Sequence, residues 1–198
     1  MNMKKKDIIL SGVGGQGILS IATVIGWAAL DQNLHLKQAE VHGMSQRGGD
    51  VQSNLRISAE RIWSDLIPMG SCDLILSLEP MEALRYLPWL SKDGWIVTNS
   101  APFVNIPDYP EIDEIKAELG KVGNLITIDC DALAKEAGSP RSANMALLGA
   151  AASVLEILDP ENLRDGISNV FSRKGDKIVA ANIAAFNAGL EASKEFSK

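Results

Sequence analysis

The alternation of apolar and polar segments along the chain predicts a layered α/β fold. Six short apolar runs have the length and composition of buried strands, and they cover residues 7–11, 34–40, 51–57, 72–78, 94–99 and 124–129. Helical patterns lie between several of these runs, at residues 18–30, 80–90, 111–119 and 131–137. This alternation predicts a doubly wound, Rossmann-like three-layer sandwich with right-handed crossovers and a mostly parallel sheet.

Two parts of the chain depart from strict alternation. Residues 41–50 are too few and too rich in glycine for a helix, so we expect a hairpin-like or irregular turn there and a mixed sheet. The last third, from Arg141, is helical, with helices at 143–158, from Pro160 onward, and at 176–196. The final helix carries an apolar stripe that we interpret as core packing against the sheet rather than as an intersubunit surface: Val179, Ile183, Phe186 and Leu190.

Composition and charge narrow the class of protein. A chain of 198 residues with 46% hydrophobic and 22% charged residues is typical of one globular domain, here spanning residues 1–198. The net charge of −6 argues against nonspecific nucleic-acid binding. The apolar helix at 18–30 is shorter than the roughly 20 residues that span a bilayer, and Asp7 with the following glycines interrupts any signal peptide. We therefore expect a cytoplasmic protein without a membrane partner.

Cysteine and histidine usage argues against a metal site. Cys72 and Cys130 are far apart and form no C-x-x-C motif, so we expect no iron–sulfur cluster on this chain. A disulfide between them is one alternative, and two buried thiols in a reducing compartment are the favoured one. His35 and His42 lack the spacing of zinc ligands.

A glycine-rich turn is the most informative motif. It runs Gly12-Val13-Gly14-Gly15-Gln16-Gly17, after an apolar strand and before an uncharged helix, which is the setting that a G-x-G-x-x-G motif requires. We expect positive φ angles at these glycines, Gly14 among them. The start of the following helix presents free N–H groups and the positive end of its dipole. The loop is therefore expected to hold an anionic group or to be held by a partner.

The carboxyl ends of the other strands add polar candidates at the same edge. The segment at 40–49 is the densest, and after it come Glu79 and Asn99 at the ends of later strands. Each has an ordinary structural alternative, such as a strand-end ion pair for Glu40, a hydrogen-bonded structural role for His42 and helix initiation for Glu79. Together they form a binding-site hypothesis whose members in the dense segment are Glu40, His42, Gln46, Arg47, Gly48 and Gly49.

Four segments together resemble one family. They are Gly12–Gly17, Val41–Gly49, Leu78-Glu79-Pro80 and Asn144-Met145-Ala146-Leu147-Leu148-Gly149. The chain resembles, over nearly its whole length, the γ-type component of 2-oxoacid:ferredoxin oxidoreductases. Its second segment, with His42 and Met44, is most similar to the β subunit of the indolepyruvate branch. The resemblance adds Asn144 to the candidates and implies binding or interface roles for the glycine turn and for residues 40–49.

The resemblance also implies that the cofactors of the reaction lie on a different subunit. The family converts a 2-oxoacid, coenzyme A and oxidised ferredoxin to an acyl-CoA, CO₂ and reduced ferredoxin. Thiamine diphosphate, Mg²⁺ and iron–sulfur clusters are then expected in a large catalytic α subunit, because this chain has no Gly-Asp-Gly motif and only two cysteines. It is expected to be inactive alone and to meet ferredoxin through the complex, while self-association stays open.

Two alternatives belong to other classes. A freestanding nicotinamide-dependent dehydrogenase would use Gly12, Gly14, Gly17 and Glu40, since Glu40 stands where a ribose-binding carboxylate follows the glycines. A nucleotide-binding or regulatory module would bind a phosphate ligand without a large partner. Dinucleotide binding that is weakened by Glu40→Ala would favour the dehydrogenase, and dependence on a large subunit favours the oxidoreductase.

Overall fold

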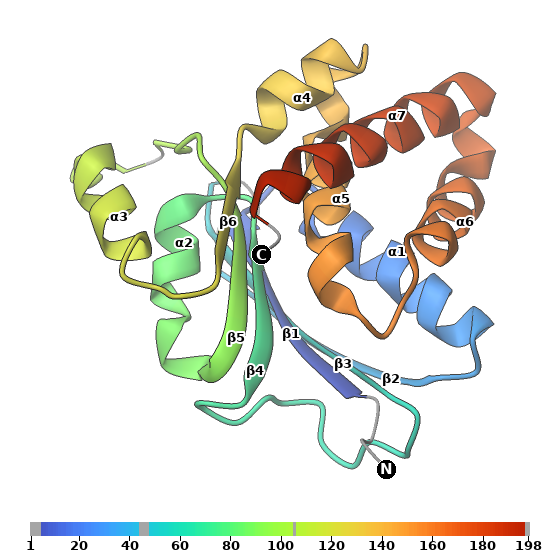
Figure 1. The fold of residues 1–198 in the computed structure, drawn as a ribbon, viewed down its shortest axis with the longest axis horizontal. Helices are drawn as coiled ribbons and strands as arrows, with labels where there is room; N and C mark the ends of the chain where they lie inside the picture. Colours follow the sequence, from blue (N-terminus) through green and yellow to red (C-terminus); the bar gives the residue numbers. More distant parts are fainter. Residues whose placement is uncertain (1–4, 44–47, 105, 197–198) are drawn as a thin grey trace.

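A six-stranded sheet runs through the middle of the computed structural model, which describes residues 5–43, 48–104 and 106–196 (Figure 1). In spatial order the strands are β2 (His35–His42), β3 (Asp50–Ser58), β1 (Lys5–Val13), β4 (Cys72–Ser77), β5 (Leu90–Asn99) and β6 (Leu125–Ile128). The pairs β1–β4, β4–β5 and β5–β6 are parallel, whereas β3 is antiparallel to both of its neighbours. The expectation of a mostly parallel sheet that is mixed at the 41–50 turn is confirmed.

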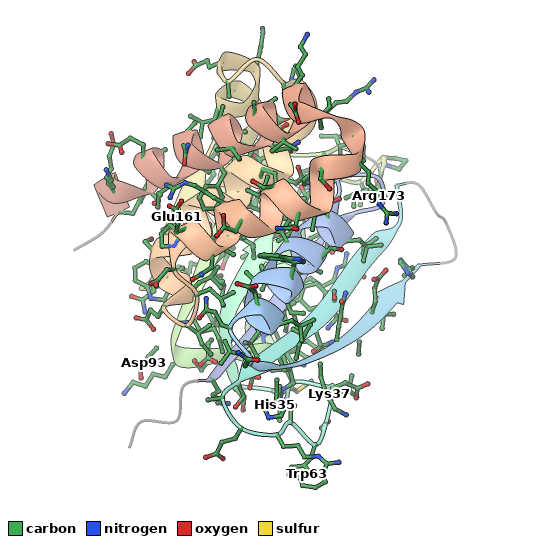
Figure 2. The ribbon with its side chains drawn as sticks, turned by 90° about the vertical axis from the view of Figure 1, so that its right-hand side faces the viewer. His35, Lys37, Trp63, Asp93, Glu161 and Arg173 are labelled. Atoms are coloured by element: carbon green, nitrogen blue, oxygen red, sulfur yellow. The ribbon has the colours of Figure 1, made fainter. Side chains whose placement is uncertain are left out.

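Helices cover both faces of the sheet (Figure 1). One face is covered by α1 (Ile18–Asp31) and α5 (Ala143–Leu155), and outside them pack α6 (Pro160–Phe171) and α7 (Asp176–Ser193) (Figure 2). α4 (Cys130–Glu136) contacts α5 and α7 on the same side, while α2 (Pro80–Arg85) and α3 (Ile112–Leu119) cover the other face. Short 3₁₀ helices complete the described elements: η1 (Leu87–Trp89), η2 (Pro140–Ser142), η3 (Ser172–Lys174) and η4 (Lys194–Phe196).

Three helices are shorter than the sequence pattern predicts, and the last of them, expected over 176–196, continues as η4 after Ser193. The helix expected over 80–90 ends at Arg85 and continues as η1, in which Pro88 has no N–H to donate to a helical hydrogen bond. The helix expected over 143–158 ends at Leu155, because Glu156 has a positive φ of 57°. In these two segments the apolar pattern of the sequence extends beyond the last helical residue. The helix ends earlier because of the local backbone geometry.

The central strands are buried on both faces, which explains their continuous apolar runs. On β1, Ile8 and Leu10 pack beneath α1 and α5, whereas Ile9 belongs to the core beneath α2 and α3. All three side chains are 0% exposed. The alternation of strand side chains thus divides the core into two layers, one on each side of the sheet.

Two glycines set the close packing of α5 on α7. A Cβ at Gly149 would lie 1.9 Å from the carbonyl oxygen of Phe186, and a Cβ at Gly189 would lie 1.8 Å from that of Ala146. The stripe on α7 belongs to the core as expected, since Phe186 is 0% exposed and its neighbours pack against the same cluster. Its main contact is α5 rather than the sheet, because the mostly apolar α5 lies between them. In the described residues, no helix has the length and hydropathy needed to cross a membrane.

Candidate functional site

The glycine turn is fastened by the side chain of Gln16. Gln16 Oε1 accepts a hydrogen bond from Val13 N at 2.7 Å, and its Nε2 donates to Leu78 O at 3.2 Å. A Cβ at Gly12 would lie 2.7 Å from Gln16 Oε1, so a glycine at this position leaves room for the amide. Gln16 therefore joins the end of β1 to the end of β4 and holds the turn in one shape.

Positive φ angles occur at some of the expected glycines. Gly15 and Gly17 have φ angles of 103° and 89°. Gly14 is not among the residues with positive φ, so the expectation for Gly14 is wrong. Its role lies in backbone pairing instead, since Gly14 N donates to Gly49 O at 2.8 Å and Gly14 O accepts from Gly48 N at 3.4 Å. These bonds tie the glycine turn to the end of the 41–50 segment.

The structure describes only some of the candidate site residues at 40–49. Gln46 and Arg47 lie outside the described residues. Glu40 and His42 lie on β2, where His42 Nε2 is 2.5 Å from Glu40 Oε1. His42 lines one hollow of about 260 Å³ beside the turn, with Val13, Gly14, Gly15, Gly17, Ile18, Leu19 and Val51. Glu40 and His42 are thus close neighbours on β2, an arrangement compatible with the structural alternatives for both residues.

The position of β3 argues against the dinucleotide-binding alternative. In a dinucleotide fold the acidic residue ends a strand directly beside the glycine strand. Here the antiparallel β3 separates β2 from β1, so Glu40 is displaced by two strand spacings, about 10 Å, from the strand that carries the glycines. The number of residues between the glycines and Glu40 fits a ribose-binding carboxylate. The order of the strands in the sheet does not.

A larger cleft opens on the other side of the glycine turn. Its volume is about 500 Å³, and four of the candidates line it: Gly15, Gln16, Asn99 and Asn144. The remaining lining residues are Leu78, Ala101, Pro102, Phe103, Asp131, Pro140, Arg141 and Ala143. Arg141 was not predicted as a site residue, although its position two residues before α5 was a signal for a cation near a helix start.

Asn144 joins the N-termini of two helices at this cleft. Its Nδ2 donates to Gly17 O at 3.1 Å, and Gly17 is the N-cap of α1, while Asn144 lies in the first turn of α5. A Cβ at Gly17 would lie 2.6 Å from Asn144 Nδ2. Neither helix start has a side-chain cap. The start of α5 lines this cleft through Ala143 and Asn144, whereas Ile18 and Leu19 at the start of α1 line the smaller hollow on the other side of the turn. The positive end of the α5 dipole therefore lies at the cleft. Such an arrangement favours an anionic group.

The second amide atom of Asn144 has no partner within the protein. Asn144 is 7% exposed, and its Oδ1 is buried without a hydrogen bond. A buried acceptor without a partner costs roughly 1–3 kcal/mol, so it favours a ligand or water that brings an N–H or O–H group. The cleft therefore offers partial positive charge for an anion, while Asn144 Oδ1 is a buried acceptor that no group of the protein satisfies.

Glu79 and Asn99 hold neighbouring loops in place. Glu79 is 0% exposed, and its Oε2 accepts from Glu82 N at 2.8 Å, which makes it the N-cap of α2. Its Oε1 accepts from Phe103 N at 3.4 Å and from the Tyr109 hydroxyl. Burial and the bond to Glu79 raise the pKa of Tyr109 above its ordinary value. Glu79 thus anchors the loop that follows β5 from beneath.

Asn99 has a similar bracing role but lines the cleft. Its Oδ1 accepts from Cys130 N at 3.0 Å, and its Nδ2 donates to Asp131 Oδ2 at 3.1 Å. The side chain therefore connects β5 to the start of α4. The Asp131 carboxylate, which sequence reasoning missed, is held at the cleft by this bond.

The two cysteines do not have the properties of cluster ligands. Both are buried free thiols on separate elements, as the favoured sequence interpretation expected. Burial raises the pKa of Cys72 to about 12 and raises that of Cys130 well above its ordinary value. Metal ligation requires thiolates, which these environments disfavour. In the described part of the chain, no group of three or more His, Cys, Asp or Glu side chains gathers into a metal site.

Comparisons with known proteins agree with this arrangement. The family described as pyruvate ferredoxin/flavodoxin oxidoreductase matches residues 7–192. The indolepyruvate oxidoreductase subunit IorB of Thermococcus kodakarensis is 38% identical, with 98% of each chain covered. The ketoisovalerate oxidoreductase subunit VorA of Methanothermobacter marburgensis is 30% identical over 92% of this chain but only 35% of its own length.

The fold has relatives among solved structures. The 2-oxoglutarate:ferredoxin oxidoreductase of Magnetococcus marinus, solved with 2-oxoglutarate, coenzyme A and succinyl-CoA bound, superposes with a TM-score of 0.77 at 23% identity. The match covers 98% of this chain and 32% of that chain, so this chain spans about a third of it. From the family match and the full-length similarity to IorB, the chain belongs to the pyruvate ferredoxin/flavodoxin oxidoreductase family.

Proposed function

We propose that this chain is the small subunit of an indolepyruvate-type 2-oxoacid:ferredoxin oxidoreductase. Full-length similarity to IorB supports the indolepyruvate branch. The observation that carries the chemical assignment is the cleft at the N-terminus of α5, with Arg141 at its wall and Asn144 in its lining. In this proposal the cleft binds a polar anionic substrate.

The redox chemistry belongs to a larger partner in this proposal. The reaction joins the acyl group of a 2-oxoacid to coenzyme A, releases CO₂ and passes the electrons one at a time to ferredoxin. It needs thiamine diphosphate, Mg²⁺ and iron–sulfur clusters, and the two buried, protonated thiols of this chain do not suit cluster ligation. The large α subunit would supply these groups, and ferredoxin would dock on the assembled complex.

Coenzyme A is the ligand that we assign to the cleft. Its phosphates match the partial positive charge at the start of α5 and the guanidinium of Arg141. The Asp131 carboxylate, bonded to Asn99 Nδ2, also lines the cleft and disfavours a phosphate beside it. One end of coenzyme A would rest on this chain while its thiol reaches the partner.

The proposal places the complex in the cytoplasm, since both cysteines are unpaired thiols and reduced ferredoxin needs a reducing compartment. It also treats residues 1–198 as one functional unit, in line with a family match over residues 7–192. The glycine turn then has a double role, because Gly15 and Gln16 line the cleft and the turn also shapes the hollow that His42 lines.

A substrate panel tests the proposal. The large subunit of the same source would be reconstituted with this chain, and reduction of a viologen dye would be followed anaerobically with coenzyme A present. We expect oxidation of indolepyruvate to exceed that of pyruvate, 2-oxoglutarate and 2-oxoisovalerate. A complex that prefers a small aliphatic 2-oxoacid would overturn the indolepyruvate assignment. A complex that oxidises none of them would overturn the subunit assignment.

A further inference from the structure

The loop between β3 and β4, residues 59–71, exposes three large apolar side chains. Trp63, Met69 and Leu66 are 78%, 68% and 58% exposed. The loop lies at the edge of the sheet opposite the glycine turn (Figure 1), and Trp63 points away from the body of the protein (Figure 2). Apolar side chains gathered on one loop in this way are typical of a contact surface.

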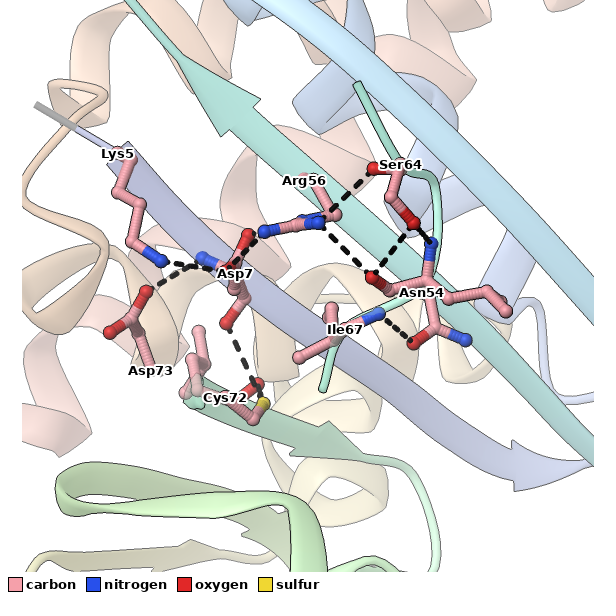
Figure 3. Close-up of polar contacts among 10 residues, drawn as sticks. Lys5, Asp7, Asn54, Arg56, Ser64, Ile67, Cys72 and Asp73 are labelled. Atoms are coloured by element: carbon pink, nitrogen blue, oxygen red, sulfur yellow. Dashed lines mark hydrogen bonds and ion pairs between the residues drawn. The ribbon is translucent and has the colours of Figure 1, made fainter. Parts of the chain in front are cut away.

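The exposed side chains are carried on a firmly held backbone. Arg56 of β3 donates from Nη1 to Ser64 O at 3.1 Å and to Leu66 O at 3.0 Å (Figure 3). Its Nε and Nη2 donate to the two carboxylate oxygens of Asp7 at 2.8 and 3.0 Å. One guanidinium thus connects the loop to β1, and only a planar, five-donor group can make both pairs of bonds.

A second anchor lies at Ile67. This side chain is 4% exposed and packs in the core beneath α2 and α3, while its N donates to Asn54 Oδ1 at 3.3 Å (Figure 3). Nearer the end of the loop, Gly70 N donates to Pro88 O at 3.0 Å. These anchors fix the backbone of the loop. The apolar side chains beside Ile67 are therefore held at the surface in a defined position.

The chemistry of this surface fits a protein partner. The Arg61 guanidinium stacks on the Trp63 ring at 4.2 Å, and tryptophan, arginine and methionine are enriched at the centres of protein interfaces. Acidic residues flank the apolar ones at Glu60 and Asp65, and the chain carries a net charge of −6. Nucleic acids and anionic bilayers both favour a basic surface. The same net charge on two copies disfavours self-association.

We propose that loop 59–71, through Trp63, Leu66 and Met69, is a docking surface for the large subunit. The inference rests on the proposed function. In VorA the region that matches this chain is 35% of a longer polypeptide, so there the domain is covalently joined to the rest of its subunit. A separate chain must replace that linkage by a noncovalent contact, and a rigid apolar loop loses little entropy on binding. The loop lies at the end of the sheet opposite the coenzyme A cleft, so the large subunit would contact this chain at both ends.

Binding to the large subunit tests the inference. The double variant Trp63→Ala/Met69→Ala removes the two most exposed apolar side chains, and Ile178→Ala on α7 is the matched control, with a side chain that is 41% exposed. We expect the Kd for the large subunit to rise about tenfold or more in the double variant and to stay unchanged in the control. Unfolding midpoints of the isolated variants should match the unmodified chain.

Amide hydrogen exchange in the complex and sedimentation of the isolated chain distinguish docking of the large subunit from self-association. On complex formation, slower exchange of amides within 59–71 supports the docking surface, and unchanged exchange overturns it. If the double variant assembles normally into an active complex, the inference falls while the proposed function stands. If the unmodified chain does not bind the large subunit, both fall. If the isolated chain dimerises and the double variant is monomeric, the occupant is a second copy and the inference is overturned.

Discussion

At the scale of single residues, the site depends on side chains that satisfy the backbone as well as on those that face the cleft. Gln16 and Glu79 use their polar atoms to hold loops, whereas Arg141 lines the cleft and Asn144 Oδ1 has no hydrogen-bond partner within the protein. Sequence reasoning placed all the amide and carboxylate candidates in one group. It had no means to separate them, because hydrogen-bond partners from distant segments decide which polar atoms remain free.

Arg141 is expected to govern the affinity for coenzyme A. Arg141→Ala removes an exposed cation at the cleft without removing a packed side chain, so the fold should be unaffected. A charge-assisted hydrogen bond is worth about 1.5–3 kcal/mol, so we expect the KM for coenzyme A in the complex to rise about tenfold or more. Arg173→Ala, at an exposed arginine after α6, is the control. An unchanged KM in the Arg141 variant would remove the phosphate role.

Gly17 is expected to tolerate no side chain. Gly17→Ala combines a φ of 89° with a Cβ only 2.6 Å from Asn144 Nδ2, so we expect a loss of about 2–3 kcal/mol in the free energy of unfolding. Gly15→Ala is a matched control, since Gly15 has a φ of 103° but open space around its Cβ position. Urea unfolding should show the smaller, strain-only loss for Gly15→Ala. Equal losses would mean that the contact with Asn144 contributes nothing.

Asp7 is expected to give the protein a pH-dependent stability. Burial alone would raise its pKa, but hydrogen bonds from Arg56 and Lys5 outweigh burial and hold the pKa of Asp7 below its ordinary value. The stabilisation is then complete above the unfolded-state pKa, about 3.9, and is lost as the pH falls through the lower pKa of the folded state. Asp7→Asn should lower the free energy of unfolding by about 3 kcal/mol at pH 7.

The pH dependence distinguishes this ion pair from simple packing. Stability curves of the unmodified chain and of Asp7→Asn should converge as the pH falls below about 4, since the protonated carboxyl no longer attracts Arg56 and Lys5. A constant difference between the two curves from neutral to acidic pH would contradict the assigned pKa shift.

At the scale of elements, the crossing of α5 and α7 depends on glycines that helix propensity alone disfavours. Gly189→Ala would gain about 1 kcal/mol from propensity, yet its Cβ would lie 1.8 Å from the carbonyl oxygen of Ala146. We expect the helices to be forced apart and the free energy of unfolding to fall by about 3 kcal/mol. Ala184→Gly, at an exposed position of the same helix, should cost only the propensity difference. A Gly189→Ala variant as stable as the unmodified chain would contradict the close packing.

Elements that form through local interactions could be predicted from the sequence, and features that depend on contacts between distant segments could not. Apolar runs and turn residues act locally, so the strands, most helices and the turn at 41–50 were predictable. The insertion of β3 between β2 and β1 depends on tertiary pairing, and it moved Glu40 away from the glycine turn. The exposure of Trp63 was likewise hidden, because it follows from Arg56 and Ile67 holding the loop from beneath.

At the scale of the whole molecule, the two ends of the sheet carry different candidate surfaces. The carboxyl ends of the parallel strands carry the cleft at the start of α5, while the opposite end of the sheet carries the loop 59–71. The protein belongs to a family of oxidoreductases, but its own thiols are buried and protonated. The account that joins these facts is a substrate-binding subunit that works only with a redox partner.

Titration of the large subunit with this chain tests that account most directly. Coenzyme A-dependent, viologen-linked oxidation of indolepyruvate would be measured anaerobically at a fixed concentration of large subunit and rising amounts of this chain. We predict little activity without the chain and a linear rise to a plateau at a fixed ratio of the two chains. Full activity of the large subunit alone, unchanged by any amount of this chain, would contradict the account.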